Sequence, residues 1–338
     1  MEPIAVHMSL IGLTILGFII SFYIAMKKHT GARLVCPMKS DCNAVIHSHH
    51  SRFLGFRVEY LGMFYYGLLA FYHGLFIVFP AIGTPFLLFI GIVVSAQAFL
   101  FSCYLVAIQA FVLKEWCTWC LTSAFLCLLI FIITLVHVPM PLPELFGHFT
   151  RVVTIVHLFG TTIGVGAATI TDIFFFRFLR DYRISEEESS ILKLLSNVIW
   201  VALGILIMTG IILFIPKSAV LLVSGKFLTK MTAIAVLIVN GFLLNIIIQP
   251  RLVQITFGGD HAHKEGELHH LRKLAFALGG ISITSWYFIF VLGTLRGVTV
   301  AYTPLVLAYG GLLLFAVIGS QIFDHYFIQK APGVVSEE

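Results

Sequence analysis

Charged residues are scarce in this chain of 338 residues: Asp, Glu, Lys and Arg make up only 11% of it, against about 25% in soluble globular proteins. Hydrophobic residues reach 59%, and the mean hydropathy is +1.01. A water-soluble fold would have no place for so much apolar surface. The small net charge of +5 comes without a basic stripe and interleaved aromatic residues, so a nucleic acid is not an expected partner. The expected environment is the lipid bilayer.

Long polar segments are lacking as well. No stretch between the apolar runs approaches the roughly 50 residues of a small soluble domain. A cleaved signal peptide is not expected, because the first apolar run, Pro3–Met26, is too long and has no small-residue cleavage site. This run is therefore expected to remain as the first membrane span.

What the sequence does contain is a series of long apolar runs. A membrane-spanning helix needs about 20 mostly apolar residues, and nine segments meet this requirement. We therefore predict an all-α membrane protein with nine or so transmembrane helices. The segments are Pro3–Met26, Val58–Phe79, Thr84–Leu113, Cys117–Val138, Thr150–Leu179, Ile191–Pro216, Phe227–Ile248, His270–Leu295 and Pro304–Ile328.

A proline-rich break separates the fourth span from the fifth. Three prolines fall within the five residues from Pro139 to Pro143, and proline ends helices and stiffens turns. We place a domain boundary here. Residues 1–138 are predicted to form a four-helix domain, and residues 139–338 a five-helix membrane domain of unknown function.

Four of the six cysteines lie at predicted membrane boundaries. Cys36 and Cys42 follow the first span, and Cys117 and Cys120 form a Cys-x-x-Cys motif at the start of the fourth. Counting spans places both pairs on one side of the membrane. A thiolate attacks a disulfide sulfur, so two pairs within reach can pass a disulfide between them. The position of the motif at a helix N-terminus favours its thiolate form.

Other uses of these cysteines are compatible with the sequence. The four could form a structural disulfide framework in a non-catalytic membrane scaffold. They could also bind copper or zinc with His47, His49 and His50, since thiolate and imidazole suit both metals, which would fit a metal transporter. The histidines are equally compatible with a solvated turn or with proton transfer. The remaining cysteines, Cys103 and Cys127, are predicted to pack as small hydrophobic residues.

The segment from Cys36 to Ser48 carries a family resemblance. It reads C-P-M-K-S-D-C-N-A-V-I-H-S, with a serine six residues after the second cysteine. Together with Leu61-Gly62 and the motif C-T-W-C at the fourth span, it resembles the bacterial homologues of vitamin K epoxide reductase. The resemblance covers about residues 1–138. Arg57 departs from it, because many homologues have proline at this position.

The resemblance implies a four-helix bundle around a quinone, such as ubiquinone or menaquinone. Cys120 would face the quinone and Cys117 would exchange disulfides with Cys42. Cys36 with Cys42 would take electrons from a separate thioredoxin-like protein. Ser48 would support the quinone pocket by hydrogen bonding. The implied activity is to oxidise the dithiol of the partner and to pass two electrons to the quinone, which supports disulfide formation in other proteins.

Two arguments about orientation disagree. We expect a multi-pass protein of the plasma membrane, and the family usually places its cysteines outside the cytoplasm, where disulfides persist. The positive-inside rule points the other way, because basic residues gather on the cysteine side and only Arg151 lies opposite. Those on the cysteine side are Lys27, Lys28, Arg33, Lys39, Arg52, Arg57 and Lys114. The exocytoplasmic side is the slightly favoured expectation.

The second half of the sequence contains ionisable residues within predicted spans. His157 and Asp172 are candidates for function, because such residues are costly in hydrocarbon. A b-type haem on His157 is not favoured, since His325 is expected towards the opposite membrane face and no other histidine lies within a span at matching depth. The small residues that follow His157 predict close helix packing.

Overall fold

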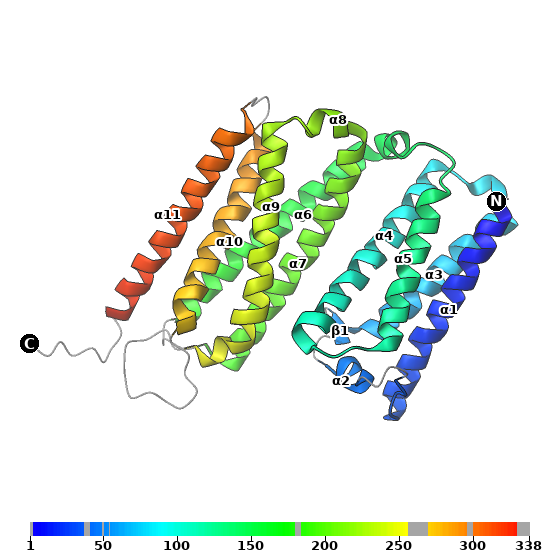
Figure 1. Ribbon diagram of the computed structural model, residues 1–338, viewed down its shortest axis with the longest axis horizontal. Coiled ribbons are helices and arrows are strands. Elements are labelled where there is room, and N and C mark those ends of the chain that lie inside the picture. The colour runs from blue at the N-terminus through cyan, green and yellow to red at the C-terminus, as the bar shows by residue number, and fades with distance from the viewer. Residues whose placement is uncertain are drawn as a thin grey trace, which may run out of the picture. The chain divides into compact units, whose positions relative to one another are not determined.

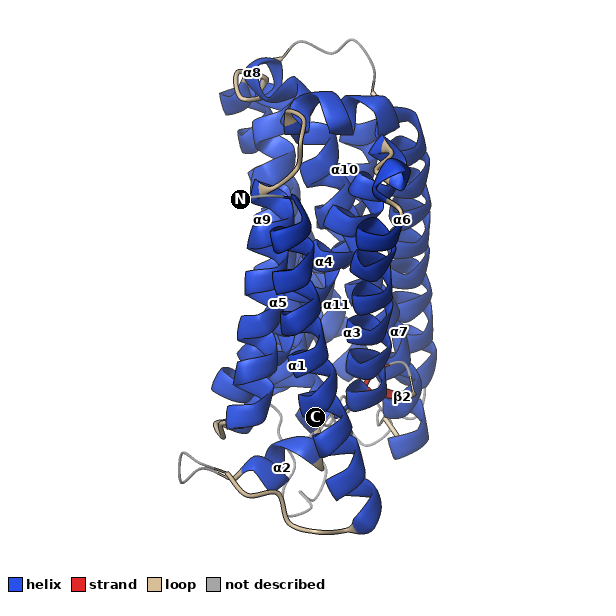
Figure 2. Cartoon of the chain, turned by 90° about the vertical axis from the view of Figure 1, so that its right-hand side faces the viewer, coloured by secondary structure: helices blue, strands red, loops and turns tan. Residues whose placement is uncertain are grey.

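The computed structural model describes residues 3–36, 41–48, 51–53, 55–179, 184–255, 270–295 and 300–329. Helices account for nearly all of them (Figure 2), and the two short strands β1 (Arg52–Phe53) and β2 (Phe56–Arg57) pair antiparallel. Within these ranges, nine helices are long and apolar enough to cross a membrane. The predicted class, an all-α membrane protein that crosses the bilayer several times, is therefore confirmed.

Close contacts divide the chain into two compact units, Met1–Thr150 and Arg151–Glu338. The assignment of residues 1–138 and 139–338 as separate functional domains stays a prediction. The first unit contains α1 (Pro3–Thr30), α2 (Cys42–Ile46), α3 (Val58–Val78), the 3-10 turn η2 (Pro80–Ile82), α4 (Pro85–Ala107), the π-helical turn η3 (Ile108–Leu113) and α5 (Thr118–Val136) (Figure 1).

The second unit contains most of α6 (Leu142–Phe178), whose first turns belong to the first unit, and the helices that follow it. These are α7 (Glu186–Phe214), η5 (Ile215–Lys217), α8 (Ser218–Leu221), α9 (Gly225–Leu243), η6 (Leu244–Ile248), η7 (Gln249–Gln254), α10 (His270–Thr294) and α11 (Tyr302–Gln329).

Two helices, α6 and α7, begin at earlier residues than the apolar runs predict. Pro143 does not interrupt a helix but lies in the first turn of α6, where a backbone N–H has no partner within the helix and its absence costs no hydrogen bond. In α7, the three glutamates of the predicted polar loop form the first turn. Ser185 and Glu188 cap each other's backbone N–H there, so a polar segment starts the helix.

In the second unit, two contacts between polar side chains join neighbouring spans. Arg272 of α10 forms a buried ion pair with Asp324 of α11, with Nε 2.8 Å from Oδ1. His157 of α6 lies 2.7 Å from the hydroxyl of Thr209 on α7, measured from Nδ1 to Oγ1. Each contact joins two helices, and this satisfies polar groups that would be costly to leave unpaired in hydrocarbon.

In the first unit, α1 packs along α3 and α5, and α5 packs along α4. Helices α3 and α4 meet near the end remote from the cysteines, where the Tyr72 hydroxyl donates to the carbonyl of Leu87 at 2.9 Å. The Tyr72 ring fills the space beside Gly91. Towards the cysteine end, residues of both helices line the cavity described below.

A glycine lets α1 approach α3. A Cβ atom on Gly17 would lie 2.3 Å from Cε1 of Tyr66, closer than any real side-chain contact. Tyr66 is buried, and its hydroxyl lies 2.9 Å from both the Oγ and the carbonyl oxygen of Ser123 on α5. The absence of a side chain at Gly17 thus allows one tyrosine to tie three helices together.

We expect Gly17→Ala to lower the stability of the protein by about 1–3 kcal/mol, the usual cost of overpacking a core. The matched control is Gly12→Ala, because a Cβ there meets no atom within 4 Å. Alanine favours helix over glycine, so the control should leave stability unchanged or raise it slightly. Thermal unfolding in detergent compares the two variants. Equal melting temperatures would contradict the close packing of α1 on α3.

Candidate functional site

A disulfide joins Cys36 to Cys42, with Cα atoms 5.8 Å apart. Cys42 begins α2, which Asp41 caps by accepting hydrogen bonds from two backbone N–H groups of its first turn. The side chain of Asn43 accepts a hydrogen bond from the backbone N–H of Leu34 at 3.0 Å. The backbone is therefore fixed on both sides of the disulfide.

Cys117 and Cys120 are both thiols in the structure. Cys117 is the N-cap residue of α5 and is fully buried, while Cys120 in the first turn is partly exposed. A hydrogen bond from the Cys120 side chain lowers the pKa of Cys117, and backbone N–H groups of Cys120 and Trp119 add to the effect against the opposing effect of burial. Cys117 is thus the thiol that ionises more readily.

The structure brings the two cysteine pairs together. The indole N–H of Trp119 donates to the carbonyl of Val35 at 3.0 Å, and Cys36 Sγ lies 3.7 Å from Thr118 Oγ1. All four cysteines of the two pairs belong to, or pack against, one buried apolar cluster of the first unit. The loop after α1 and the start of α5 therefore meet at one end of the bundle.

Gln109 holds the motif from α4. The π-helical turn η3 ends α4, and the buried Gln109 within it accepts a hydrogen bond from the backbone N–H of Cys117 at 2.8 Å. Turns of this kind often occur at functional sites. Sequence reasoning did not select this residue. The available signal was one of two glutamines in an apolar run, eight residues before the motif.

A cavity of about 590 Å³ opens beside Cys120, within the range of about 300–1,000 Å³ that is usual for small-molecule sites. It lies among α3, α4 and α5, and its lining is mostly apolar. Cys120 and Ser48 line it, whereas Cys117 does not. The Ser48 hydroxyl donates to the carbonyl of Val45 at 2.8 Å. One thiol of the motif therefore faces the cavity, and the other faces the loop.

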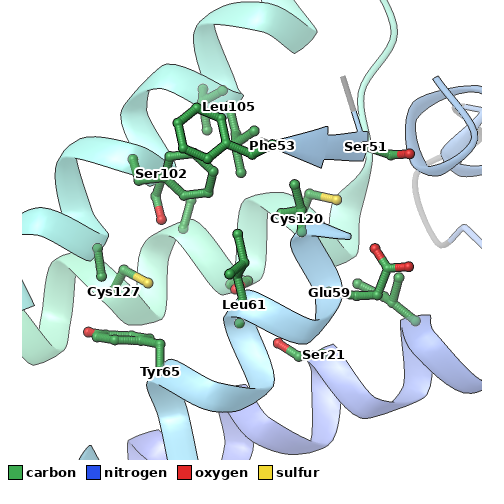
Figure 3. Close-up of a pocket in the computed structure, with 18 of the residues that line it drawn as sticks. Ser21, Ser51, Phe53, Glu59, Leu61, Tyr65, Ser102, Leu105, Cys120 and Cys127 are labelled. Carbon is green, nitrogen blue, oxygen red and sulfur yellow. The ribbon is translucent and has the colours of Figure 1, made fainter. Parts of the chain in front are cut away.

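The far end of the cavity has its own polar groups. Figure 3 shows Tyr65 and Cys127 there, away from Cys120. The Cys127 thiol lies 3.3 Å from the Tyr66 hydroxyl, so this cysteine does more than fill apolar space. In the part of the chain that the structure describes, the buried Tyr65 hydroxyl has no oxygen or nitrogen partner. It is a hydrogen-bond donor available to a molecule in the cavity.

An ion pair stands at the cysteine end of the same cavity. Lys28 of α1 places its Nζ 3.1 Å from Oε1 of Glu59, the second residue of α3, and both side chains are almost fully buried. Lys28 also donates to the hydroxyl of Ser51 at 3.2 Å. Glu59 and Ser51 both line the cavity. Neither Lys28 nor Glu59 was selected as a site residue from the sequence.

The metal-binding alternative gains no support from the geometry. Cys36 and Cys42 are bonded to each other, and His47 is exposed with Nδ1 3.0 Å from the carbonyl oxygen of Asn43. Within the described ranges, no three His, Cys, Asp or Glu side chains are grouped to hold a metal ion. His49 and His50 lie outside the described residues.

Comparison with known proteins identifies one family. Residues 8–135 match the sequence model of the vitamin K epoxide reductase family. The match contains both cysteine pairs and all the elements that surround the cavity. No curated protein and no solved structure gives a significant match.

We expect Gln109→Leu to destabilise the start of α5, because a buried N–H without an acceptor costs about 1–3 kcal/mol. Gln109→Glu keeps an acceptor oxygen and should lose less. Gln97→Leu is the matched control, since Gln97 lines the same cavity but is exposed and remote from the motif. Unfolding in detergent and the alkylation rate of Cys117 report the effect. If the two leucine variants behave alike, Gln109 does not hold the motif.

Proposed function

We propose that this membrane protein, whose residues 8–135 match the vitamin K epoxide reductase family, is an oxidoreductase that couples thiol oxidation to quinone reduction. It accepts electrons from the dithiol of a thioredoxin-like protein and thereby supports disulfide formation in other proteins. The observation that carries the proposal is the division of labour within the motif: Cys117 packs with the loop disulfide, and Cys120 lines the cavity.

The exposure of the two loop cysteines indicates which of them the partner protein attacks. Cys42 is fully buried, whereas Cys36 is partly exposed and follows the highly exposed Val35. A thiolate of the partner therefore attacks Cys36, and Cys42 leaves as a thiolate. The second thiol of the partner then releases Cys36. The partner ends as a disulfide and the loop pair as two thiols.

The next exchange takes place within the bundle. When Cys117 and Cys120 form a disulfide, the Cys42 thiolate attacks Cys117 and Cys120 leaves as the thiolate that faces the cavity. Cys36 then attacks Cys42, which restores the loop disulfide and frees Cys117, and the proton that Cys36 loses passes to the Cys120 thiolate. The structure has this final arrangement, with a disulfide at Cys36–Cys42 and thiols at Cys117 and Cys120.

The cavity fits a quinone head group. Its walls are mostly apolar, and the Tyr65 hydroxyl can donate a hydrogen bond to a carbonyl oxygen, while Ser48 and Ser51 also line the cavity. Phe64 and Leu68 line the cavity and are also exposed on the outer surface of the bundle, at 71% and 43%. A lipid-soluble molecule can therefore enter from the membrane between α3 and α4. A bound quinone supplies an acceptor for two electrons and two protons.

The plasma membrane as location and the exocytoplasmic side for the cysteines stay predictions. The partly exposed Cys36 and the family match support a thioredoxin-like partner, and ubiquinone and menaquinone are both candidate acceptors.

We expect Cys117→Ala and Cys120→Ala to abolish reduction of a short-chain benzoquinone or naphthoquinone by dithiothreitol, because neither variant can form the motif disulfide. Cys36→Ala and Cys42→Ala should block electron transfer from a reduced thioredoxin-like protein. Cys103→Ala is the control, since Cys103 is exposed on α4 and does not line the cavity. Quinone absorbance in detergent or nanodiscs measures the rate. Quinone reduction by Cys120→Ala at the normal rate would refute the proposal.

A further inference from the structure

We propose that Glu59 accepts the proton of Cys120 when the motif is oxidised, and that Lys28 positions the Glu59 carboxylate for this task. The inference rests on the proposed function. It assigns a catalytic role to a carboxylate that stands at the same end of the cavity as the reacting sulfur atom. Figure 3 shows Glu59 and Cys120 near each other at that end, with Ser51 beside them.

A buried carboxylate at this position needs an explanation. The side chain of Glu59 is only 4% exposed, and an ionised group inside an apolar bundle is costly unless it is paired. Lys28 supplies the pairing charge: its Nζ donates to Oε2 of Glu59 at 3.3 Å. A pair of apolar residues would join α1 to α3 at lower cost. The charged pair is therefore better explained by chemistry than by packing.

One oxygen of the carboxylate is left able to accept a proton. Oε1 of Glu59 lies 3.1 Å from Lys28 Nζ, yet the contact lacks hydrogen-bond geometry. Within the described residues, Oε1 has no hydrogen-bond donor although it is buried. Glu59 lines the cavity onto which Cys120 opens. A proton can thus pass from the thiol to this oxygen without displacing an existing hydrogen bond.

The reaction requires such an acceptor. Cys117 is the more readily ionised thiol, because Cys120 donates a hydrogen bond to its sulfur. Cys120 therefore still carries its proton when oxidation begins. Formation of the Cys117–Cys120 bond releases that proton and two electrons. The electrons pass to the quinone. Glu59 holds the proton from Cys120 and then gives it to an oxygen of the reduced quinone. The second proton comes from water, which balances the proton that Cys117 released to water earlier.

No other charged group competes for this role among the described residues that surround Glu59. Lys28 on α1, with Cys117 and Cys120 at the start of α5, are the titratable groups that act on this end of the cavity. The α4 wall contributes uncharged side chains such as Gln97, Ser102 and Gln109. On α3 itself, Tyr65 lies at the far end. In the described part of the chain, Glu59 is the one carboxylate that lines the cavity.

The test is the pH dependence of quinone reduction by dithiothreitol in Glu59→Gln. We expect the rate near neutral pH to fall on the order of 10²-fold, the usual contribution of a general base. The loss should shrink as the pH rises, because hydroxide then takes the proton from Cys120, so the variant has a steeper profile than the wild type. Glu59→Asp should restore part of the rate. The control Glu144→Gln removes an exposed carboxylate outside the cavity and should change nothing.

The double variant Lys28→Gln/Glu59→Gln distinguishes a structural role of the ion pair from a role in proton transfer. It removes both charges, so no unpaired charge is left buried. If the pair only ties α1 to α3, the double variant regains the wild-type rate and pH profile, and the inference is wrong. If Glu59 accepts the proton, the double variant is folded but remains slow near neutral pH. Exchange between Cys42 and Cys117 should proceed in every variant. A wild-type protein that reduces no quinone would instead overturn the proposed function itself.

Discussion

Contact between the loop after α1 and the first turn of α5 is the constraint on which the rest of the site depends. The Trp119 indole reaches the carbonyl of Val35, and the sulfur atoms of both pairs meet in one buried cluster. Neither pair could pass electrons to the other from opposite ends of a bundle whose helices span a membrane. Three further contacts hold this end in place: the cap of α2 by Asp41, the hydrogen bond that Gln109 accepts from the backbone N–H of Cys117, and the ion pair of Lys28 with Glu59.

The motif then has two faces because it begins a helix. At the N-cap, Cys117 turns towards the loop and receives hydrogen bonds that favour its thiolate, whereas Cys120, three residues later, opens onto the cavity. A single helical turn thus separates exchange between sulfur atoms from electron transfer into the lipid phase. The cavity is lined by residues of both α3 and α4, and we propose that the quinone enters it from the membrane between these two helices.

The sequence predicts the spans and the meeting of the cysteine pairs because these depend on length, hydropathy and the parity of membrane crossings. It does not predict which helix face lines the cavity, since within lipid every face is apolar and periodicity carries little information. For this reason Gln109, Glu59 and Cys127 were overlooked or taken as packing residues. The early start of α7 was predictable in principle, because Ser185 and Glu188 have the spacing of a capping box. The role of the second unit was not, and its His157–Thr209 and Arg272–Asp324 contacts explain packing alone.

Trapping the exchange between the pairs tests the central claim most directly. A variant with Cys36→Ala and Cys120→Ala retains Cys42 and Cys117 as the only reactive partners at this end of the bundle. Mild oxidation in native membranes should join them in an intramolecular disulfide, detected as one linked peptide by mass spectrometry, while Cys127 stays unlinked. Recovery of Cys42 and Cys117 as free thiols, or bonded to other partners, would show that the two pairs do not meet and would contradict the account.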